Sequence, residues 1–194
     1  MPTAGKSTMA ENLSKHLNLP WISSDQIGII MREVATREKY PELFTWEDYG
    51  SLQYLNKFTA NEIADKEFAK GEAVWLGVRK LIKKDYSWNN GFIIEGDDIL
   101  PHLVARDFSD SSNIKAVFIG DHDIERIRNV VSARAVLWND PAAYSSSVQE
   151  KEVEWVINFS EKLKSQALKY KMPWVEVEKN EHDLAKVLTA LGLG

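Results

Sequence analysis

The sequence predicts an α/β protein in which helices flank a parallel β-sheet. Short apolar runs of the kind found in buried strands alternate along the chain with longer amphipathic stretches. The composition is globular, with 44% hydrophobic and 27% charged residues. A chain of 194 residues is long enough for one sizeable core. We therefore expect a single domain over residues 1–194.

The first half of the chain predicts one strand among several helices. Apolar residues at helical spacing predict a helix over residues 5–17, which the sequence Asn-Leu-Pro then stops. A short strand is expected over residues 21–25, and residues 27–37 have a helical pattern. Further helical patterns occupy residues 47–86 and are interrupted near Gly71.

The second half repeats the alternation of strand and helix. Its apolar runs predict three more strands, and its amphipathic stretches predict three more helices. The strands are expected at residues 92–96, 114–120 and 174–177. The helices are expected at residues 124–138, 147–171 and 183–191, with a turn at residues 139–141.

The N-terminus carries the second half of a phosphate-binding loop. A complete loop reads G-x-x-x-x-G-K-[ST], and residues 1–4 fill the four variable positions before Gly5-Lys6-Ser7-Thr8. The glycine permits a turn that aims backbone N–H groups at phosphate oxygens, and the helix adds its positive end. Lys6 would reach the β- and γ-phosphates of ATP, and the Ser7 hydroxyl would bind Mg²⁺. The nucleotide-binding residues expected from this motif are Thr3, Ala4, Gly5, Lys6, Ser7 and Thr8.

An ordinary capped helix start with a lysine nearby is the alternative explanation of this motif. The strand and aspartate that follow at the proper distance favour the phosphate loop.

Asp25 and Arg32 follow the first predicted strand and are candidates for binding an acceptor. The Asp25 carboxylate is placed to take the proton from an acceptor hydroxyl, as a general base or an orienting group. Alternatively, Ser24 or Asp25 caps the next helix, and the two roles do not exclude each other. Arg32 lies two helical turns further on. It is either a clamp for an anionic acceptor or a solvated arginine.

Acidic residues follow the strand at residues 92–96. Carboxylates at this edge of a parallel sheet organise Mg²⁺ or the acceptor in nucleotide-binding proteins. We expect Glu95 and Asp97 to contribute to this site, ahead of Asp98. Solvent-facing loop carboxylates are the alternative.

Arginines on the helical stretch after residue 123 are candidates for stabilising the transferred phosphoryl group. Arg126 and Arg134 are eight residues apart, so they lie on nearly one face of a helix. A movable helix with guanidinium groups on that face can close over the negative charge that develops in phosphoryl transfer. A charged, solvated face is the alternative.

Charge and composition exclude several classes of function. The net charge of −5 argues against a broad nucleic-acid-binding surface. The sequence has neither an apolar run long enough to cross a membrane nor a signal sequence, so we expect a cytoplasmic protein with no membrane partner. The absence of cysteine fits a reducing compartment and excludes thiolate metal sites.

Taken in order, these segments resemble the P-loop small-molecule kinases, most nearly the 2-phosphoglycerate kinase-like group. The resemblance rests on four segments spread over most of the chain, of which the phosphate loop is the most specific. The segments are Gly5-Lys6-Ser7-Thr8, the stretch from Ile22 to Asp25 leading into Arg32-Glu33-Val34, Ile93-Ile94-Glu95-Gly96, and Tyr170 to Glu176.

The resemblance implies a three-layer α/β/α sandwich that binds ATP and Mg²⁺. It implies transfer of the γ-phosphate to a small acceptor, phosphoglycerate-like or another hydroxyl compound. Helical substrate and lid regions are then expected at about residues 40–90 and 123–147. A non-catalytic or degenerate nucleotide-binding module and a nucleoside monophosphate kinase are the alternative functions.

Compared with this family, the sequence lacks the strand before the phosphate loop and the loop's first glycine. In the family that strand lies in the middle of the sheet, so its absence leaves backbone groups unpaired on both neighbours. We therefore expect an open or distorted sheet between the strands at residues 92–95 and 114–119, or a fragment of a longer protein.

Overall fold

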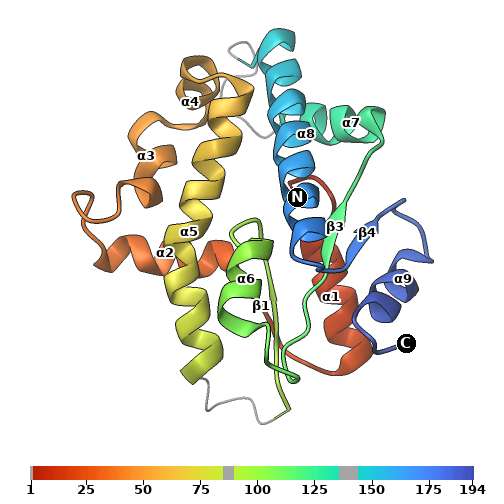
Figure 1. Cartoon of the computed structure of the whole chain (residues 1–194). Coiled ribbons are helices and arrows are strands. Elements are labelled where there is room, and N and C mark those ends of the chain that lie inside the picture. The colour runs from red at the N-terminus through yellow and green to blue at the C-terminus, as the bar shows by residue number, and fades with distance from the viewer. Residues whose placement is uncertain (1, 85–89, 136–143) are drawn as a thin grey trace.

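The computed structural model describes residues 2–84, 90–135 and 144–194, and these form a mostly helical α/β structure with short parallel strands (Figure 1). The strands are β1 (Trp21–Ser23), β2 (Ile93–Glu95), β3 (Phe118–Gly120) and β4 (Trp174–Glu176). The helices are α1 (Lys6–Leu17), α2 (Ser24–Val34), the 3₁₀ helix η1 (Pro41–Phe44), α3 (Thr45–Tyr49), α4 (Ser51–Lys57), α5 (Ala60–Lys84), α6 (Pro101–Phe108), α7 (Ile124–Ala135), α8 (Ser146–Lys169) and α9 (Asp183–Ala190).

The four strands form two separate parallel pairs. β1 pairs with β2, and Ser23 lies opposite Glu95 in the register. β3 pairs with β4, and Gly120 lies opposite Glu176. Within the described residues, β2 and β3 are not hydrogen-bonded to each other. The opening expected between these two strands is therefore present.

The long helices α5 and α8 lie side by side at the centre of the molecule (Figure 1). Phe68 of α5 packs on Phe159 of α8 with ring centroids 4.9 Å apart. An ion pair between Asp65 and Lys162 joins the same two helices at 2.5 Å. Burying these apolar side chains is the main stabilising contribution at this contact.

Two elements differ from the sequence prediction. α5 continues without a break through Gly71. The glycine fits the packing of the helix against Leu100, because a Cβ at residue 71 would lie 3.0 Å from the Leu100 Cδ1 atom. The sequence interpretation also missed α6, which begins with Pro101 and buries Leu103 and Val104. A proline is favourable at the first position of a helix, because a backbone N–H at that position would have no hydrogen-bond partner within the helix. The turn expected at residues 139–141 lies outside the described residues.

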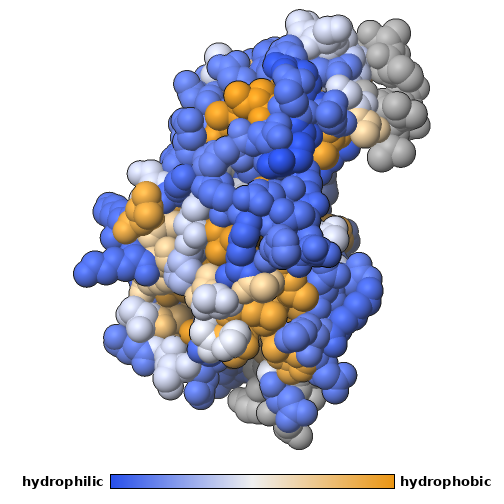
Figure 2. Space-filling model, turned by 90° about the vertical axis from the view of Figure 1, so that its right-hand side faces the viewer, coloured by the Kyte–Doolittle hydropathy of each residue, from blue (hydrophilic) through white to orange (hydrophobic). Residues whose placement is uncertain are grey.

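The face that carries β4 and α9 is largely hydrophilic, with smaller apolar patches in its upper half and more of them in its lower half (Figure 2). Large apolar side chains also reach solvent on α2, where Ile30 is 64% and Val34 is 81% exposed. Among the residues that the structure describes, no helix combines the length and the apolar character needed to span a membrane.

Asp107 attaches α6 to α5 through polar contacts. Its carboxylate accepts a hydrogen bond of 2.6 Å from the buried Trp75 indole and pairs with Arg79 at 3.4 Å and Arg106 at 2.9 Å. The indole hydrogen bond, assisted by Arg106 and opposed by partial burial, lowers the pKa of Asp107 to about 2.

This contact predicts a loss of stability in acid. The pKa of Asp107 is lower in the folded chain than in the unfolded chain. Its carboxylate therefore contributes fully to stability above pH 3.8, and this contribution is lost as the pH falls towards 2. Asp107→Asn should lower the free energy of unfolding at neutral pH by about 1–3 kcal/mol and flatten its dependence on pH in that window. Denaturant titrations at neutral and acid pH measure both effects. Asp110→Asn, an exposed neighbour, is the control and should change neither quantity.

The separation of the two strand pairs predicts the effect of an added strand. An N-terminal extension of about eight apolar, β-branched residues ending in glycine should raise both the melting temperature and the affinity for ATP. The added strand would pair with β2 and β3, which belong to separate strand pairs, and the glycine would occupy the first position of the predicted phosphate-loop motif. A Gly/Ser-rich extension of equal length is the control. If the apolar extension performs no better than this control, our account of the N-terminus is wrong.

Candidate functional site

The carboxyl ends of β1 and β2 and the start of α1 meet in one place. Because the two strands are parallel with Ser23 opposite Glu95, the residues that follow each strand lie at the same edge. Asp25 comes from the segment after β1. Asp97 and Asp98 come from the segment after β2. This edge thus gathers side chains from three parts of the chain.

Two residues of the predicted phosphate loop have a positive φ. Gly5, directly before α1, has φ +80° and ψ 29°. Thr3 also has a positive φ, of 66°, and is buried with Ala4. Ser7 and Thr8 are exposed in the first turn of α1, where free N–H groups and the positive helix end favour an anion.

Two contacts join the start of α1 to the acidic segment after β2. The Lys6 ammonium lies 2.9 Å from the Asp97 carboxylate, and the Ser7 hydroxyl donates a hydrogen bond of 3.2 Å to Glu95. Burial by itself would raise the pKa of Asp97, but Lys6 outweighs it and holds that pKa below its ordinary value. The structure therefore brings together four side chains that the sequence singled out.

Asp25 does not cap α2. The cap is Ser23, whose hydroxyl accepts a hydrogen bond of 3.2 Å from the Asp25 backbone N–H. Gln26 completes this capping box from its side chain. The expectation that Ser24 or Asp25 is the cap is thus wrong by one residue. The Asp25 carboxylate is left to face a pocket instead.

That pocket has a volume of about 230 Å³ and lies between α2, α5 and the η1–α3 segment. Its apolar wall consists of Gly28, Ile29, Leu43, Trp46 and Val74. Its polar residues are Asp25, Arg32, Lys70 and Asp98. Partial burial of the carboxyl group, followed by repulsion from Asp98, raises the pKa of Asp25. A raised pKa suits a carboxylate that accepts a proton near neutral pH.

A buried polar network forms the inner end of the pocket. Asp98 is 1% exposed and accepts a hydrogen bond of 2.8 Å from the Ser24 hydroxyl. Lys70 lies 3.4 Å from Asp98 and 2.8 Å from Glu67. Burial would lower the pKa of Lys70, but Glu67 and Asp98 outweigh it and raise that pKa. Lys70 therefore stays charged.

Gly96 lets the network form. It has φ +151°, and a Cβ at this residue would lie 1.8 Å from the Ser24 hydroxyl oxygen. The segment after β2 approaches Ser24 this closely only because residue 96 has no side chain.

The outer wall of the pocket is fixed by further carboxylates. The Arg32 guanidinium pairs with Glu47 at 2.8 Å. The Trp46 indole donates a hydrogen bond of 2.5 Å to Glu67, and the Tyr54 hydroxyl donates to the same oxygen at 3.4 Å. Glu67 thus connects the pocket wall to the Lys70 network.

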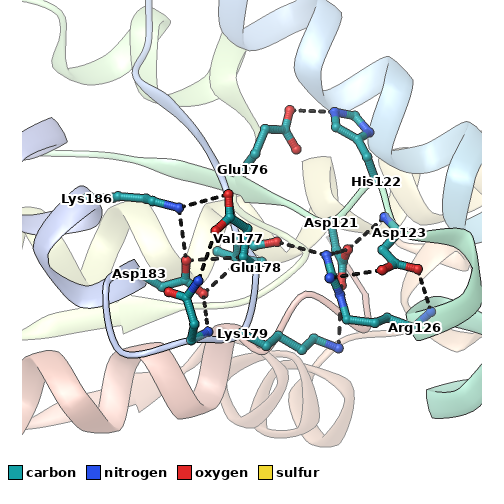
Figure 3. A network of polar contacts seen from close by, with 11 residues as sticks. Asp121, His122, Asp123, Arg126, Glu176, Val177, Glu178, Lys179, Asp183 and Lys186 are labelled. Carbon is teal, nitrogen blue, oxygen red and sulfur yellow. Dashed lines mark hydrogen bonds and ion pairs between the residues drawn. The ribbon is translucent and has the colours of Figure 1, made fainter.

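Arg126 lies at the carboxyl edge of the other strand pair (Figure 3). Asp121, whose side chain is fully buried, accepts from its guanidinium at 2.7 and 3.2 Å. Asp123 pairs with it at 3.0 Å, and the Val177 carbonyl accepts from it at 3.3 Å. Lys179 reaches Asp121 at 3.5 Å. This network attaches the start of α7 to the loop after β4.

Arg134 lies near the end of α7 and faces α8. Its guanidinium is 3.9 Å from Glu152. Burial raises the pKa of Glu152 to about 7, and Arg134 opposes this rise. The partners of Arg126 and Arg134 named here are not the residues that contact Lys6 and Ser7, so a role for these arginines at the transferred phosphate stays a prediction.

Two polar residues of the pocket were missed or ranked low from sequence. Lys70 lies inside a long helical pattern with several lysines, and only its position between two small residues, Ala69 and Gly71, marks it. Asp98 ranked below Glu95 and Asp97, yet it is the most buried of the three. Its burial depends on the turn at Gly96.

Comparison with known proteins finds similarity to curated kinases. The chain is 26% identical over 139 residues to the 2-phosphoglycerate kinase of Methanococcus vannielii, covering 67% of this chain and 44% of the relative. It is 26% identical over 118 residues to the 2-phosphoglycerate kinase of Methanothermobacter thermautotrophicus, covering 59% of this chain and 38% of the relative. No protein-family model matches the chain, and no solved structure matches it.

These matches support a kinase-like relationship and leave much of each relative unmatched. The chain spans less than half the length of the curated relatives that it matches.

Proposed function

We propose that this chain is an ATP-dependent kinase that transfers the γ-phosphate of ATP to a hydroxyl group of a small acceptor. The observation that carries the proposal is the meeting of Lys6 and Ser7, at the start of α1, with Asp97 and Glu95. The pocket that contains Asp25 supplies a place for the acceptor at the same sheet edge. The similarity to proteins named 2-phosphoglycerate kinase supports the same class of reaction.

The residues at the start of α1 fit a magnesium nucleotide. Ser7 and Glu95 offer oxygen ligands 3.2 Å apart, and Mg²⁺ prefers oxygen ligands. Within the described ranges, no group of three or more acidic or histidine side chains could hold a metal by itself. This suits an ion carried mainly by nucleotide phosphates. When bound, Mg²⁺ would neutralise charge on the β- and γ-phosphates.

The Lys6 ammonium pairs with the Asp97 carboxylate, and a phosphate oxygen can replace that carboxylate as its partner. In the proposed complex its ammonium exchanges the carboxylate for the γ-phosphate, while backbone N–H groups at residues 3–8 bind the other phosphate oxygens. Asp97 and Glu95 then hold the start of α1 in place before the nucleotide binds.

Asp25 is the proposed base of the transfer. The acceptor oxygen attacks the γ-phosphorus, and the new O–P bond forms as the bond to the oxygen bridging the β- and γ-phosphates breaks. ADP leaves with the bonding electron pair, and the acceptor hydroxyl proton passes to the Asp25 carboxylate. The raised pKa of Asp25 favours this proton transfer.

Lys6→Ala tests the phosphate loop. The variant should lose at least about a hundredfold in kcat/KM for ATP, because a cation on the transferred phosphate is worth several kcal/mol at the transition state. Steady-state ADP release in the presence of an acceptor panel measures the loss. Lys15→Ala is the control, since Lys15 lies on the same helix, is 71% exposed and pairs with Glu11 in the neighbouring turn. Unchanged turnover in Lys6→Ala would end the phosphate-loop assignment.

Asp25→Asn tests the proposed base. It keeps the size of the side chain and removes the proton acceptor, so turnover should fall about a hundredfold or more while the free energy of unfolding changes little. Ser23→Ala is the matched control: loss of the helix cap should cost about 1 kcal/mol of stability and leave most of the turnover. A variant Asp25→Asn that keeps full activity removes Asp25 from the mechanism. Nucleotide binding without acceptor-dependent ADP release in the parent chain would instead indicate a non-catalytic binding module.

A further inference from the structure

The proposed transfer brings a negatively charged phosphoryl group to an edge that is rich in carboxylates. Glu95 and Asp97 lie beside the start of α1, and Asp25 and Asp98 line the pocket. Phosphoryl transfer spreads negative charge over the oxygens of the moving group. A cation on the side of the acceptor would therefore stabilise the transfer, in addition to Lys6 on the side of ATP.

The arginines that could supply this cation have other partners. Arg126 pairs with a carboxylate at the edge of the other strand pair, and Arg134 pairs with one on α8. Arg32 lines the pocket, but Glu47 binds it at 2.8 Å on the outer wall. Lys70 lines the same pocket and belongs to the buried network at its inner end. The inner end of the pocket thus has a lysine as its cation.

Two successive carboxylates after β2 hold the two lysines. Asp97 pairs with Lys6 at 2.9 Å, and Asp98 lies 3.4 Å from Lys70. Burial, followed by repulsion from Asp98, raises the pKa of Asp25. Attraction by each of the two lysines partly offsets this rise. The proposed base therefore lies within electrostatic reach of both ammonium groups.

The Lys70 ammonium can donate a hydrogen bond into the pocket. An ammonium group has three N–H donors. Glu67 binds it at 2.8 Å, whereas Asp98 lies at 3.4 Å. Within the described residues the buried Oδ1 atom of Asp98 accepts no hydrogen bond, so this second contact is a charge pair only. The Lys70 side chain is 17% exposed, and water therefore screens its charge little.

Lys70 stays charged throughout the proposed reaction. Burial would lower the pKa of Lys70, but Glu67 and Asp98 outweigh it and raise that pKa. A protonated amine has no lone pair, so it neither takes the proton of the acceptor nor forms a bond to phosphorus. Its contribution is a fixed positive charge with N–H donors.

We propose that Lys70 is a catalytic residue that donates a hydrogen bond to an oxygen of the γ-phosphoryl group as this group passes from ATP to the acceptor. The inference rests on the proposed kinase function. Lys6 would bind the phosphoryl group from the side of ATP, and Lys70 would bind it from the side of Asp25. Glu67, which binds Lys70 and accepts the Trp46 indole N–H, is then a positioning residue that aims the ammonium.

Binding of a transition-state analogue tests this contact without an acceptor. Aluminium fluoride takes the place of the transferred phosphoryl group beside MgADP, and transition-state analogues bind more tightly than ground-state ligands. The parent chain should therefore bind MgADP more tightly when aluminium fluoride is present. Loss of Lys70 should reduce this gain at least about tenfold and change the affinity for MgADP alone little, because ADP has no γ-phosphate. Calorimetric titrations with and without fluoride measure both affinities.

The test removes Lys70 together with its partner, because Lys70→Gln alone leaves the buried Glu67 carboxylate uncompensated. The double variant Lys70→Gln, Glu67→Gln is compared with Glu67→Gln, so that the difference between the two reports Lys70. Lys66→Gln is the control and should keep the full gain, since Lys66 lies one turn earlier on α5 and its ammonium lies over the Phe58 ring, 4.4 Å from the centroid.

The outcomes separate the inference from the kinase function. Equal gains from aluminium fluoride in the double variant and in Glu67→Gln overturn the inference and leave the kinase function standing. A parent chain that binds no MgADP, or that gains nothing from aluminium fluoride, removes the kinase function and the inference with it.

NMR on the parent chain decides the same question if the double variant does not fold. Because Trp46 and Lys70 both bind Glu67, the Trp46 indole N–H resonance should shift when Lys70 turns towards the phosphoryl group. Adding aluminium fluoride to the MgADP complex should produce this shift. The indole of Trp75, which donates to Asp107, is the internal reference and should not shift. An unchanged Trp46 resonance, or an equal shift of both indoles, overturns the inference.

Discussion

The parallel pairing of β1 with β2 is the constraint on which the candidate site depends. Three residues in each strand set the register, and that register puts Ser23 beside Glu95. The segments after the two strands then leave the sheet at the same edge, where α1 also begins. The contacts of Lys6 with Asp97 and of Ser7 with Glu95 follow from this arrangement. A shift of register would separate the proposed nucleotide and acceptor sites.

The same buried charges contribute to the stability of the fold and shape the candidate site. Removing one partner from a buried ion pair leaves an uncompensated charge, which costs more than the pair contributes. Asp98 and Glu67 hold Lys70 in this way and also shape the pocket. Changes at these carboxylates therefore alter the acceptor site and the fold together. Asp25 differs, because Ser23 caps α2 and Lys70 pairs with Asp98. Function can therefore be tested at Asp25 with little change in stability.

The sequence predicted the parts of the structure that local chemistry determines. The glycine and lysine of the predicted phosphate loop located the start of α1, and apolar runs located all four described strands. Contacts between residues distant in the sequence were harder to predict. Nothing local shows that Lys70 reaches Asp98 or that α5 passes unbroken through Gly71 beside Leu100, because these outcomes depend on how α5 packs. The cap at Ser23 was missed by one residue, since Ser23, Ser24 and Asp25 are all favourable cap residues.

The close approach of Gly96 to Ser24 has an evolutionary consequence. With 1.8 Å between the position of a Cβ on residue 96 and the Ser24 hydroxyl oxygen, neither residue can change freely while the other stays as it is. A smaller residue at 24 would not admit a side chain at 96, because the Cβ of residue 24 would still lie 2.7 Å away and residue 96 has a φ of +151° that residues with a side chain rarely adopt. Among homologues that keep the hydrogen bond from Ser24 to Asp98, glycine should therefore be retained at position 96.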